Sequence, residues 1–139
     1  MTTAAGSKPS VLVVDDEEVI ACLLEEVLVQ SGFNVQTALS GEQGYKHFAE
    51  NKEDWSCIII DMTMPDMLGT ELYRRMCDLR KGVPVIFVSG YNSEPSTLKS
   101  AENTTVRFLQ KPFTPFELAK EVSAIVEQSS KTSSPESSG

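Results

Sequence analysis

The sequence predicts an α/β fold in which a doubly wound parallel sheet of five strands is covered by helices on both faces. Short continuous runs of apolar residues alternate along the chain with segments whose apolar residues recur at helical spacing. Such runs are typical of strands buried on both faces, and strict alternation of strand and helix favours a parallel sheet. The 139 residues suit one domain and are too few for an eight-stranded barrel.

The first half of the chain contains two strand–helix units. Residues 11–14 form a β-branched run that predicts a buried strand. A helix follows and ends near Gly32, because glycine is typical of the position after a helix. The predicted apolar face of this helix comprises Ile20, Leu23, Leu24, Val27 and Leu28. Residues 33–39 alternate as in a second strand, and Ser40 marks the start of a helix that runs to about residue 51.

The second half contains three more units. Strands are expected at residues 57–60, 85–88 and 106–109, of which the first gives the clearest β signal. The helix after residues 57–60 has an apolar face that comprises Leu68, Leu72, Met76 and Leu79. A helix is expected over residues 92–101, with Pro95 in its first turn. The apolar face of the last helix comprises Leu118, Val122, Ile125 and Val126.

Composition limits the organisation of the chain and its partners. Residues 1–9 and the Ser-rich segment 129–139 are expected to be disordered, which leaves residues 10–128 as the folded domain. The net charge of −8 argues against direct binding to nucleic acid. No apolar run approaches the roughly 20 residues of a membrane span, and the N-terminus lacks the apolar core of a signal peptide. Three cysteines without CxxC spacing favour a reduced, cytoplasmic setting.

Polar residues follow four of the five apolar runs. Asp15 and Asp16 follow the first run and Asp61 the third, while Ser89 follows the fourth and Lys111 comes shortly after the fifth. In an open parallel sheet, ligands bind beyond the carboxyl ends of the strands, where the strand order reverses. Any one of these residues alone is commonly a turn residue or a helix cap. Turn residues that arose independently would rarely place such polar groups after four of the five strands. We therefore expect a functional site at these strand ends.

The side chains at these strand ends suit phosphoryl chemistry. Clustered carboxylates repel one another unless a cation lies among them, and hard oxygen ligands favour Mg²⁺. A carboxylate can also attack phosphorus and form an aspartyl phosphate. Lys111 can neutralise phosphoryl oxygens and Ser89 can donate a hydrogen bond to one of them. The set is chemically complete for accepting a phosphoryl group.

Four segments together resemble the response-regulator receiver domain of two-component and phosphorelay signalling. They are VLVVDDE at 11–17, IIIDMTMPDMLG at 58–69, VIFVSG at 85–90 and KPF at 111–113, in the order and at the spacing of that family. The resemblance implies a three-layer (βα)5 fold with the flavodoxin-like strand order 2-1-3-4-5. It also implies a regulatory domain rather than an enzyme, one that catalyses only its own Mg²⁺-dependent phosphorylation and dephosphorylation.

The resemblance implies a role for each matching residue. Asp61 is expected to be the phosphoacceptor and a metal ligand. Asp16 is expected to bind Mg²⁺ directly, Asp15 to act through water, and the backbone carbonyl of Thr63 to be the third protein ligand. Ser89 supplies the hydroxyl and Lys111 the ammonium that pairs with the phosphoryl group. The peptide bond between Lys111 and Pro112 is expected to be cis.

The resemblance further implies a switch made by Ser89 and Phe108. In that scheme the hydroxyl of Ser89 moves toward the phosphoryl group and the ring of Phe108 turns inward. The surface formed by the helix over 92–101, the fifth strand and the last helix then changes, and a downstream protein binds there. Tyr91 is expected to shield the acyl phosphate from water and so to slow its hydrolysis.

Two other functions use a similar fold. Haloacid-dehalogenase-like phosphohydrolases also combine Asp, Ser or Thr, and Lys, but their nucleophile ends the first strand in a DxD pattern, whereas Asp15 and Asp16 are adjacent. A flavodoxin-like nucleotide or flavin binder needs a phosphate-cradling loop after the first strand, where these carboxylates would repel phosphate. Both alternatives are disfavoured.

The expected phosphodonor is a histidine kinase or a His-containing phosphotransfer protein. The chain has no recognisable output region after residue 128. It therefore fits a stand-alone regulator and also a receiver taken from a hybrid sensor kinase, and the sequence leaves both open.

Overall fold

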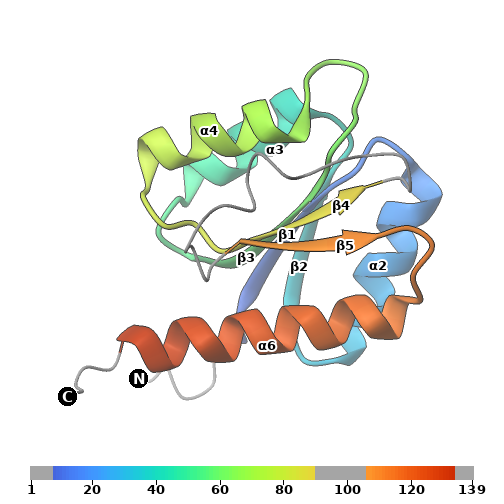
Figure 1. Cartoon of the computed structure of the whole chain (residues 1–139), viewed down its shortest axis with the longest axis vertical. Helices are drawn as coiled ribbons and strands as arrows, with labels where there is room; N and C mark the ends of the chain where they lie inside the picture. Colours follow the sequence, from blue (N-terminus) through green and yellow to red (C-terminus); the bar gives the residue numbers. More distant parts are fainter. Residues whose placement is uncertain (1–7, 90–105, 134–139) are drawn as a thin grey trace.

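The five predicted strands form one parallel sheet. The computed structural model describes residues 8–89 and 106–133. The strands are β1 (Ser10–Val14), β2 (Asn34–Ala38), β3 (Trp55–Asp61), β4 (Val85–Ser89) and β5 (Val106–Gln110). Their order is β2-β1-β3-β4-β5, and every neighbouring pair is parallel (Figure 1). This confirms the predicted doubly wound sheet, whose strand order reverses at β1 and β3.

Helices cover both faces of the sheet within the described residues. They are α2 (Glu18–Gln30), α3 (Gly41–Glu50), α4 (Gly69–Leu79) and α6 (Pro115–Ser133). The pair α2 and α6 lies on one face, and the pair α3 and α4 lies on the other (Figure 1). The helix predicted over residues 92–101 lies outside the described residues. None of the described helices is long and apolar enough to cross a membrane.

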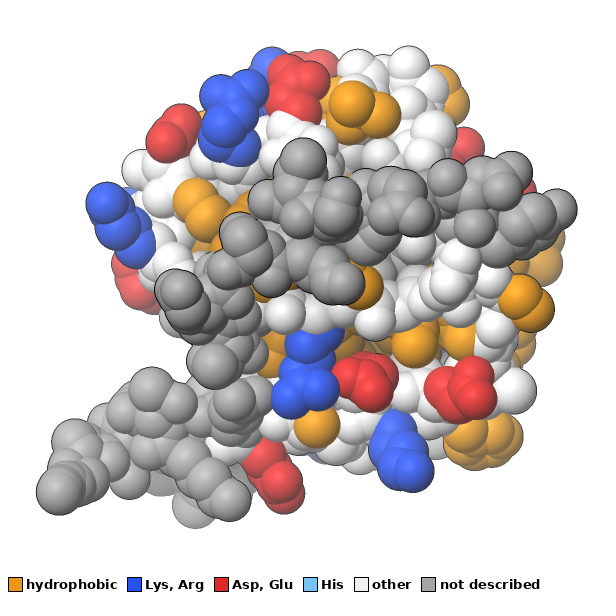
Figure 2. Space-filling model, viewed as in Figure 1, with side chains coloured by type: hydrophobic (Ala, Val, Ile, Leu, Met, Phe, Trp, Pro, Cys, Tyr) orange, Lys and Arg blue, Asp and Glu red, His pale blue; other side chains and the backbone are white. Residues whose placement is uncertain are grey.

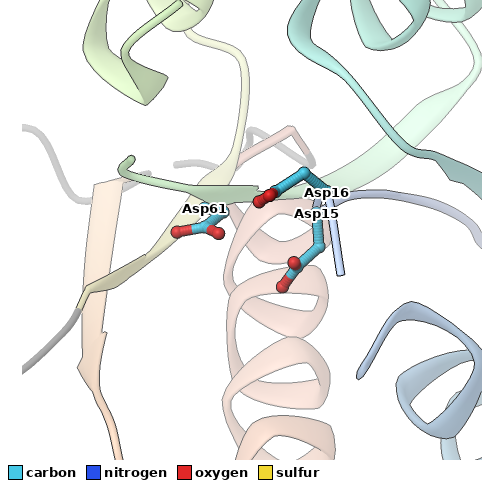
Figure 3. A group of neighbouring side chains, drawn as sticks. All are labelled: Asp15, Asp16 and Asp61. Atoms are coloured by element: carbon cyan, nitrogen blue, oxygen red, sulfur yellow. The ribbon is translucent and has the colours of Figure 1, made fainter. Parts of the chain in front are cut away.

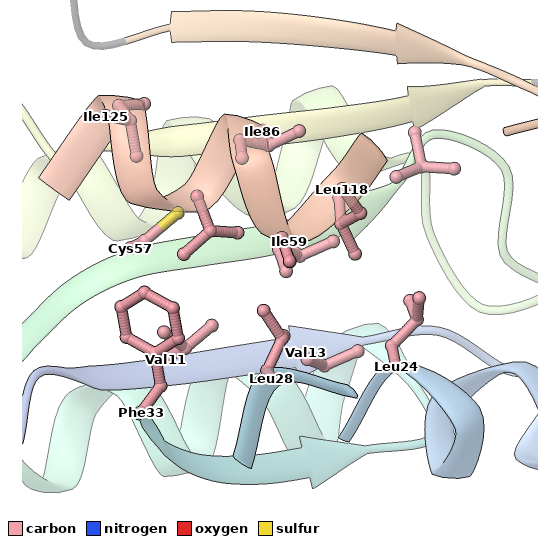
Figure 4. Close-up of a cluster of buried hydrophobic side chains, with 13 residues drawn as sticks. Val11, Val13, Leu24, Leu28, Phe33, Cys57, Ile59, Ile86, Leu118 and Ile125 are labelled. Carbon is pink, nitrogen blue, oxygen red and sulfur yellow. The ribbon is translucent and has the colours of Figure 1, made fainter. Parts of the chain in front are cut away.

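Both faces of the central strands are apolar, because alternate residues of a strand point to opposite layers. Val11, Val13 and Ile59 belong to the core cluster under α2 and α6 (Figure 4). Leu12 and Ile58 belong to the second cluster, under α3 and α4. Burial on both sides explains why the strands appear in the sequence as continuous apolar runs rather than as alternating patterns.

The turn between α2 and β2 follows the predicted glycine signal. Gly32 has a φ of +101°, in the region that favours glycine. The N–H of Gly32 donates to the carbonyl of Val29, and that of Phe33 donates to the carbonyl of Leu28, both at 3.1 Å. This is the Schellman pattern of helix ends, and it turns the chain directly into β2.

Three details of the predicted helices are wrong. Leu23 is 44% exposed and Leu68 is 57% exposed, although both are predicted in the core. Leu68 precedes α4 as its N-cap, so its side chain is not on the buried stripe of that helix. Ala21 is a buried residue of α2 instead. The helix α6 continues to Ser133, past residue 129 where the disordered tail is predicted to begin, because no glycine or proline interrupts it.

Candidate functional site

Three carboxylates lie together at the carboxyl ends of β1 and β3. The strands β1 and β3 are neighbours, and their pairing places Val14 beside Ile60. Asp15 directly follows β1 and Asp61 is the last residue of β3, so the register brings them side by side. Asp16 joins them, and ligand oxygens of the three residues all lie within 4.8 Å of one another (Figure 3).

Backbone hydrogen bonds hold two of these carboxylates in place. The N–H of Asp15 donates to the carbonyl of Ala38 at the end of β2, at 3.0 Å. The N–H of Glu17 donates to Oδ1 of Asp15 at 2.9 Å, and that of Thr63 donates to Oδ1 of Asp61 at 3.2 Å. The site is therefore built on strand ends and their first following residues, which are rigid parts of a sheet.

Burial makes it unfavourable for the carboxylates of this cluster to be ionised. Asp15 is 3% exposed and Asp61 is 8% exposed. Burial is the largest cause that raises the pKa of Asp61; the nearby Asp15 charge adds to it, the N–H of Thr63 and the Lys111 charge oppose it, and the net pKa is about 6. Burial also raises the pKa of Asp15. A divalent cation would relieve this repulsion, and a set of three carboxylates suits the oxygen-rich coordination of Mg²⁺.

Ser89 and Lys111 lie at the same edge of the sheet, at the end of β4 and just after β5. Ser89 is the last residue of β4 and is 3% exposed. The pairing of β3 with β4 places Asp61 beside Val88, one residue before Ser89. The N–H of Lys111 donates to the carbonyl of Ser89 at 2.8 Å, and the Lys111–Pro112 bond is cis, as predicted. Lys111 is close enough for its charge to lower the pKa of both Asp61 and Asp15.

The loop after β3 closes back on itself beside Asp61. The N–H of Met62 donates to the carbonyl of Val88 at 2.9 Å, and the N–H of Gly69 donates to the carbonyl of Met62 at 2.8 Å. Thr63 and Leu68 form an antiparallel bridge within it. A Cβ atom on Gly69 would lie 2.6 Å from the backbone carbonyl of Asp61, so only glycine fits there.

Comparison with known proteins gives the family. Residues 11–123 match the model of the response regulator receiver domain. The chain belongs to this family. It is therefore a regulatory signalling domain of the two-component type, and the predicted family and fold class are confirmed. The match also favours the receiver over the phosphohydrolase and the flavin binder.

Individual relatives agree with the family match. The transcriptional regulatory protein SrrA of Staphylococcus aureus is 28% identical over 122 residues, which cover 88% of this chain and 49% of SrrA. The chain thus spans about half the length of the curated relatives it matches. A CheY-like receiver domain protein of Methanospirillum hungatei JF-1 is 28% identical with a TM-score of 0.78, covering 91% of this chain and 99% of that one. The receiver domain of the hybrid histidine kinase CckA is 26% identical with a TM-score of 0.71, covering 84% and 98%.

Phe108 of this receiver domain packs against the hydrophobic core. It is half-buried on β5, directly beside Phe87 of β4 in the register. The two rings stack with centroids 5.5 Å apart and planes 20° apart, and Tyr73 of α4 meets Phe87 edge-on, with centroids also 5.5 Å apart. Phe108 therefore packs onto the α3/α4 side of the sheet. Tyr91, predicted to shield the site, lies outside the described residues.

The sequence does not single out Asp66, which joins the loop after β3 to the start of α3. The carboxylate of Asp66 accepts hydrogen bonds from the N–H groups of Gly41 and Glu42, both at 3.0 Å. Those groups belong to the first turn of α3, which lies 25 and 24 residues before Asp66 in the sequence. The only local signal is an aspartate after a proline, which reads as ordinary turn chemistry.

Proposed function

We propose that this receiver domain is a phosphorylation switch in which Asp61 accepts a phosphoryl group from a histidine kinase or a His-containing phosphotransfer protein. The observation that carries the proposal is the meeting of three carboxylates, Asp15, Asp16 and Asp61, beside Lys111 at the carboxyl edge of the sheet. A buried acidic cluster with one neighbouring ammonium group suits a divalent cation and a phosphoryl group better than it suits an isolated protein core.

Some residues of this site would bind the metal ion, and Lys111 would bind the phosphoryl group. Asp16 and Asp61 would hold Mg²⁺ directly, Asp15 would hold it through water, and the carbonyl of Thr63 would complete the protein ligands. The bound cation would neutralise charge on the phosphoryl oxygens. Lys111 would neutralise charge from the opposite side.

The transfer step requires only the carboxylate of Asp61 and the donor. A carboxylate oxygen of Asp61 forms a bond to phosphorus while the bond from phosphorus to the donor's histidine nitrogen breaks. The electron pair of the broken bond stays on that nitrogen, which returns as neutral imidazole, and Asp61 becomes an acyl phosphate. Because Asp61 must be ionised to attack, its raised pKa of about 6 lies below the pH at which transfer would run.

The same proposal assigns the switch to Ser89 and Phe108. Ser89 directly follows Val88, the residue that pairs with Asp61 in the sheet, and its hydroxyl would donate to a phosphoryl oxygen. Phe108 stacks on Phe87 and would respond when Ser89 moves. The surface of β5 and α6, together with the helix predicted over residues 92–101, would present the change to a downstream protein.

Charge indicates the partners of this switch. The net charge is −8, and on the described part of the face in Figure 2 acidic and basic side chains are interspersed. We therefore propose protein partners and no direct contact with nucleic acid. We place the domain in the cytoplasm, either as a stand-alone regulator or as part of a hybrid kinase.

The experiment is to incubate the protein with acetyl phosphate with and without Mg²⁺ and to follow its intact mass. We expect a gain of one phosphoryl group that requires Mg²⁺ and is labile in alkali. The matched control is Asp61→Asn, which keeps the size of the side chain and an acceptor for the Thr63 N–H. An adduct on that variant, or an adduct independent of Mg²⁺, would count against the proposal.

Because fast hydrolysis could hide the adduct, the second measurement is binding of beryllofluoride in the presence of Mg²⁺. We expect the wild type to bind it and Asp61→Asn not to bind it. If the wild type gives neither an adduct nor beryllofluoride binding, the phosphoacceptor role is wrong and the domain acts through partner binding alone.

A further inference from the structure

The loop that carries Thr63 is fixed at its two ends and in its middle by different contacts. Its ends meet through the hydrogen bond from Gly69 to Met62 and the bridge from Thr63 to Leu68. Met64, 6% exposed, inserts into the core under α3 and α4. Thr63 itself is exposed, so its backbone position depends on these anchors rather than on burial of its own side chain.

Asp66 anchors the middle of this loop to another part of the chain, the start of α3. Its two carboxylate oxygens each accept one N–H from the first turn of α3, those of Gly41 and Glu42, at 3.0 Å. These hydrogen bonds lower the pKa of Asp66, with the bond from Gly41 as the larger contributor. Next to this bond the loop also lies close to the helix, because a Cβ atom on Gly41 would collide with the side chain of Met67.

The start of α3 has a second, separate cap. The hydroxyl of Ser40 accepts from the N–H of Gln43 at 3.1 Å, and Oε1 of Gln43 accepts from the N–H of Leu39 at 2.8 Å. This reciprocal arrangement is made entirely within the segment that enters the helix. Ser40 therefore caps α3 through a hydrogen bond within its own segment, whereas Asp66 caps α3 from the loop after β3 and ties that loop to the helix.

We infer that Asp66 is a positioning residue for Mg²⁺: by fastening the loop after β3 to the start of α3, it fixes the backbone carbonyl of Thr63. The inference rests on the proposed function, which makes that carbonyl a metal ligand. Mg²⁺ demands nearly ideal octahedral geometry, so a small displacement of one ligand weakens binding. Groups that hold metal ligands in place commonly change metal affinity by 10–100-fold. Asp66 acts through the loop and not on a ligand directly, so we expect about three- to tenfold.

The experiment compares two ways of uncapping α3. Binding of Mg²⁺ to the full chain is measured by calorimetry for the wild type, Asp66→Ala, Asp66→Asn and Ser40→Ala. We expect Asp66→Ala to raise the Kd for Mg²⁺ about three- to tenfold. Ser40→Ala is the matched control: it removes a cap from the same helix end and leaves the loop tied, so its Kd should equal that of the wild type.

Asp66→Asn separates positioning from charge. An asparagine keeps one oxygen that can accept an N–H from α3, but it carries no charge. Positioning predicts a Kd between those of the wild type and Asp66→Ala, whereas a purely electrostatic effect predicts the same Kd for both Asp66 variants. Amide hydrogen exchange in residues 62–68 should quicken in Asp66→Ala and stay unchanged in Ser40→Ala.

Each outcome decides the inference. An unchanged Kd in Asp66→Ala, an equal rise in Ser40→Ala, or equal Kd values for Asp66→Asn and Asp66→Ala would each overturn it. In those cases a wild type that still binds Mg²⁺ and accepts a phosphoryl group leaves the proposed function intact. If the wild type binds no Mg²⁺, the proposed function fails and the inference falls with it.

Discussion

Replacing the buried carboxylate of Asp61 by asparagine should stabilise the metal-free protein. Asp61 is 8% exposed, and it shares a small volume with Asp15 and Asp16. Burial and the neighbouring charge raise its pKa, so its ionised form opposes folding when no cation is present. Asparagine has nearly the same shape, and its oxygen can still accept the N–H of Thr63.

The sign and size of the effect follow from the pKa. The pKa of Asp61 rises from its ordinary value of 3.8 to about 6. Between these values the folded state binds more protons than the unfolded state, so stability falls as the pH rises from about 4 to about 6. Above this window the loss is complete, and at about 1.4 kcal/mol for each pKa unit it amounts to about 3 kcal/mol. The pKa of about 6 already includes the opposing charge of Lys111, so we expect Asp61→Asn to gain up to about 3 kcal/mol at pH 7.5.

The assay is urea unfolding in EDTA, followed through the fluorescence of the buried Trp55. The free energies of unfolding of wild type and Asp61→Asn are compared at pH 7.5 and at pH 4. Asp54→Asn serves as the control, because Asp54 is an exposed carboxylate in the turn before β3. Its effect should stay within about 0.5 kcal/mol. Adding Mg²⁺ should stabilise the wild type and should have little effect on Asp61→Asn.

Two results would refute this reasoning. One is an Asp61→Asn variant that is no more stable than the wild type at pH 7.5 in EDTA. The other is a difference that persists unchanged at pH 4, where the carboxyl group of the folded wild type is protonated. Either would mean that the ionised Asp61 is not desolvated as its burial implies.

Three further predictions concern packing, capping and thiol exposure. Gly69→Ala should cost at least about 2 kcal/mol in urea unfolding, because its Cβ would lie 2.6 Å from the carbonyl of Asp61; Gly41→Ala meets only a flexible side chain and should cost less than half as much. Leu68→Ser should stabilise the protein by about 1 kcal/mol, because Leu68 is the N-cap residue of α4, its exposed side chain accepts no hydrogen bond from the helix, and a serine hydroxyl could accept one. An unchanged melting temperature would contradict this. With a disulfide reagent, exposed Cys22 should react in the native protein, while buried Cys57, whose pKa burial raises, should react only on unfolding.

Most of the fold can be predicted from the sequence because the strands are buried on both faces. Residues 57–60 are predicted as a strand and form the middle of β3, and Gly32 ends α2 as predicted. The errors arise where an apolar residue has helical spacing but does not lie on the buried face of the helix. Leu68 has the right spacing for the buried face of α4 but lies before the first turn, and spacing alone does not locate a helix start.

The carboxylates of the site are predictable for a topological reason. Any residue just after a parallel strand reaches the same edge of the sheet, so Asp15 and Asp61 are brought together by their positions in their own segments. The contact from Asp66 to Gly41 has no such rule behind it. It joins a loop to the first turn of a helix 25 residues earlier in the sequence. No pattern in either segment predicts that the two are in contact.

The sequence alone determined which chemical groups stand at the strand ends, because strand length, helix spacing and turn residues are set by local steric preferences and hydrophobic periodicity. Only the tertiary structure decided how those groups affect one another. Placing β1 beside β3 buries Asp61 next to Asp15 and raises its pKa, and placing β5 beside β4 stacks Phe108 on Phe87. Desolvation, like-charge repulsion and ring stacking depend on neighbours that are remote in sequence, so they exist only once the sheet has formed.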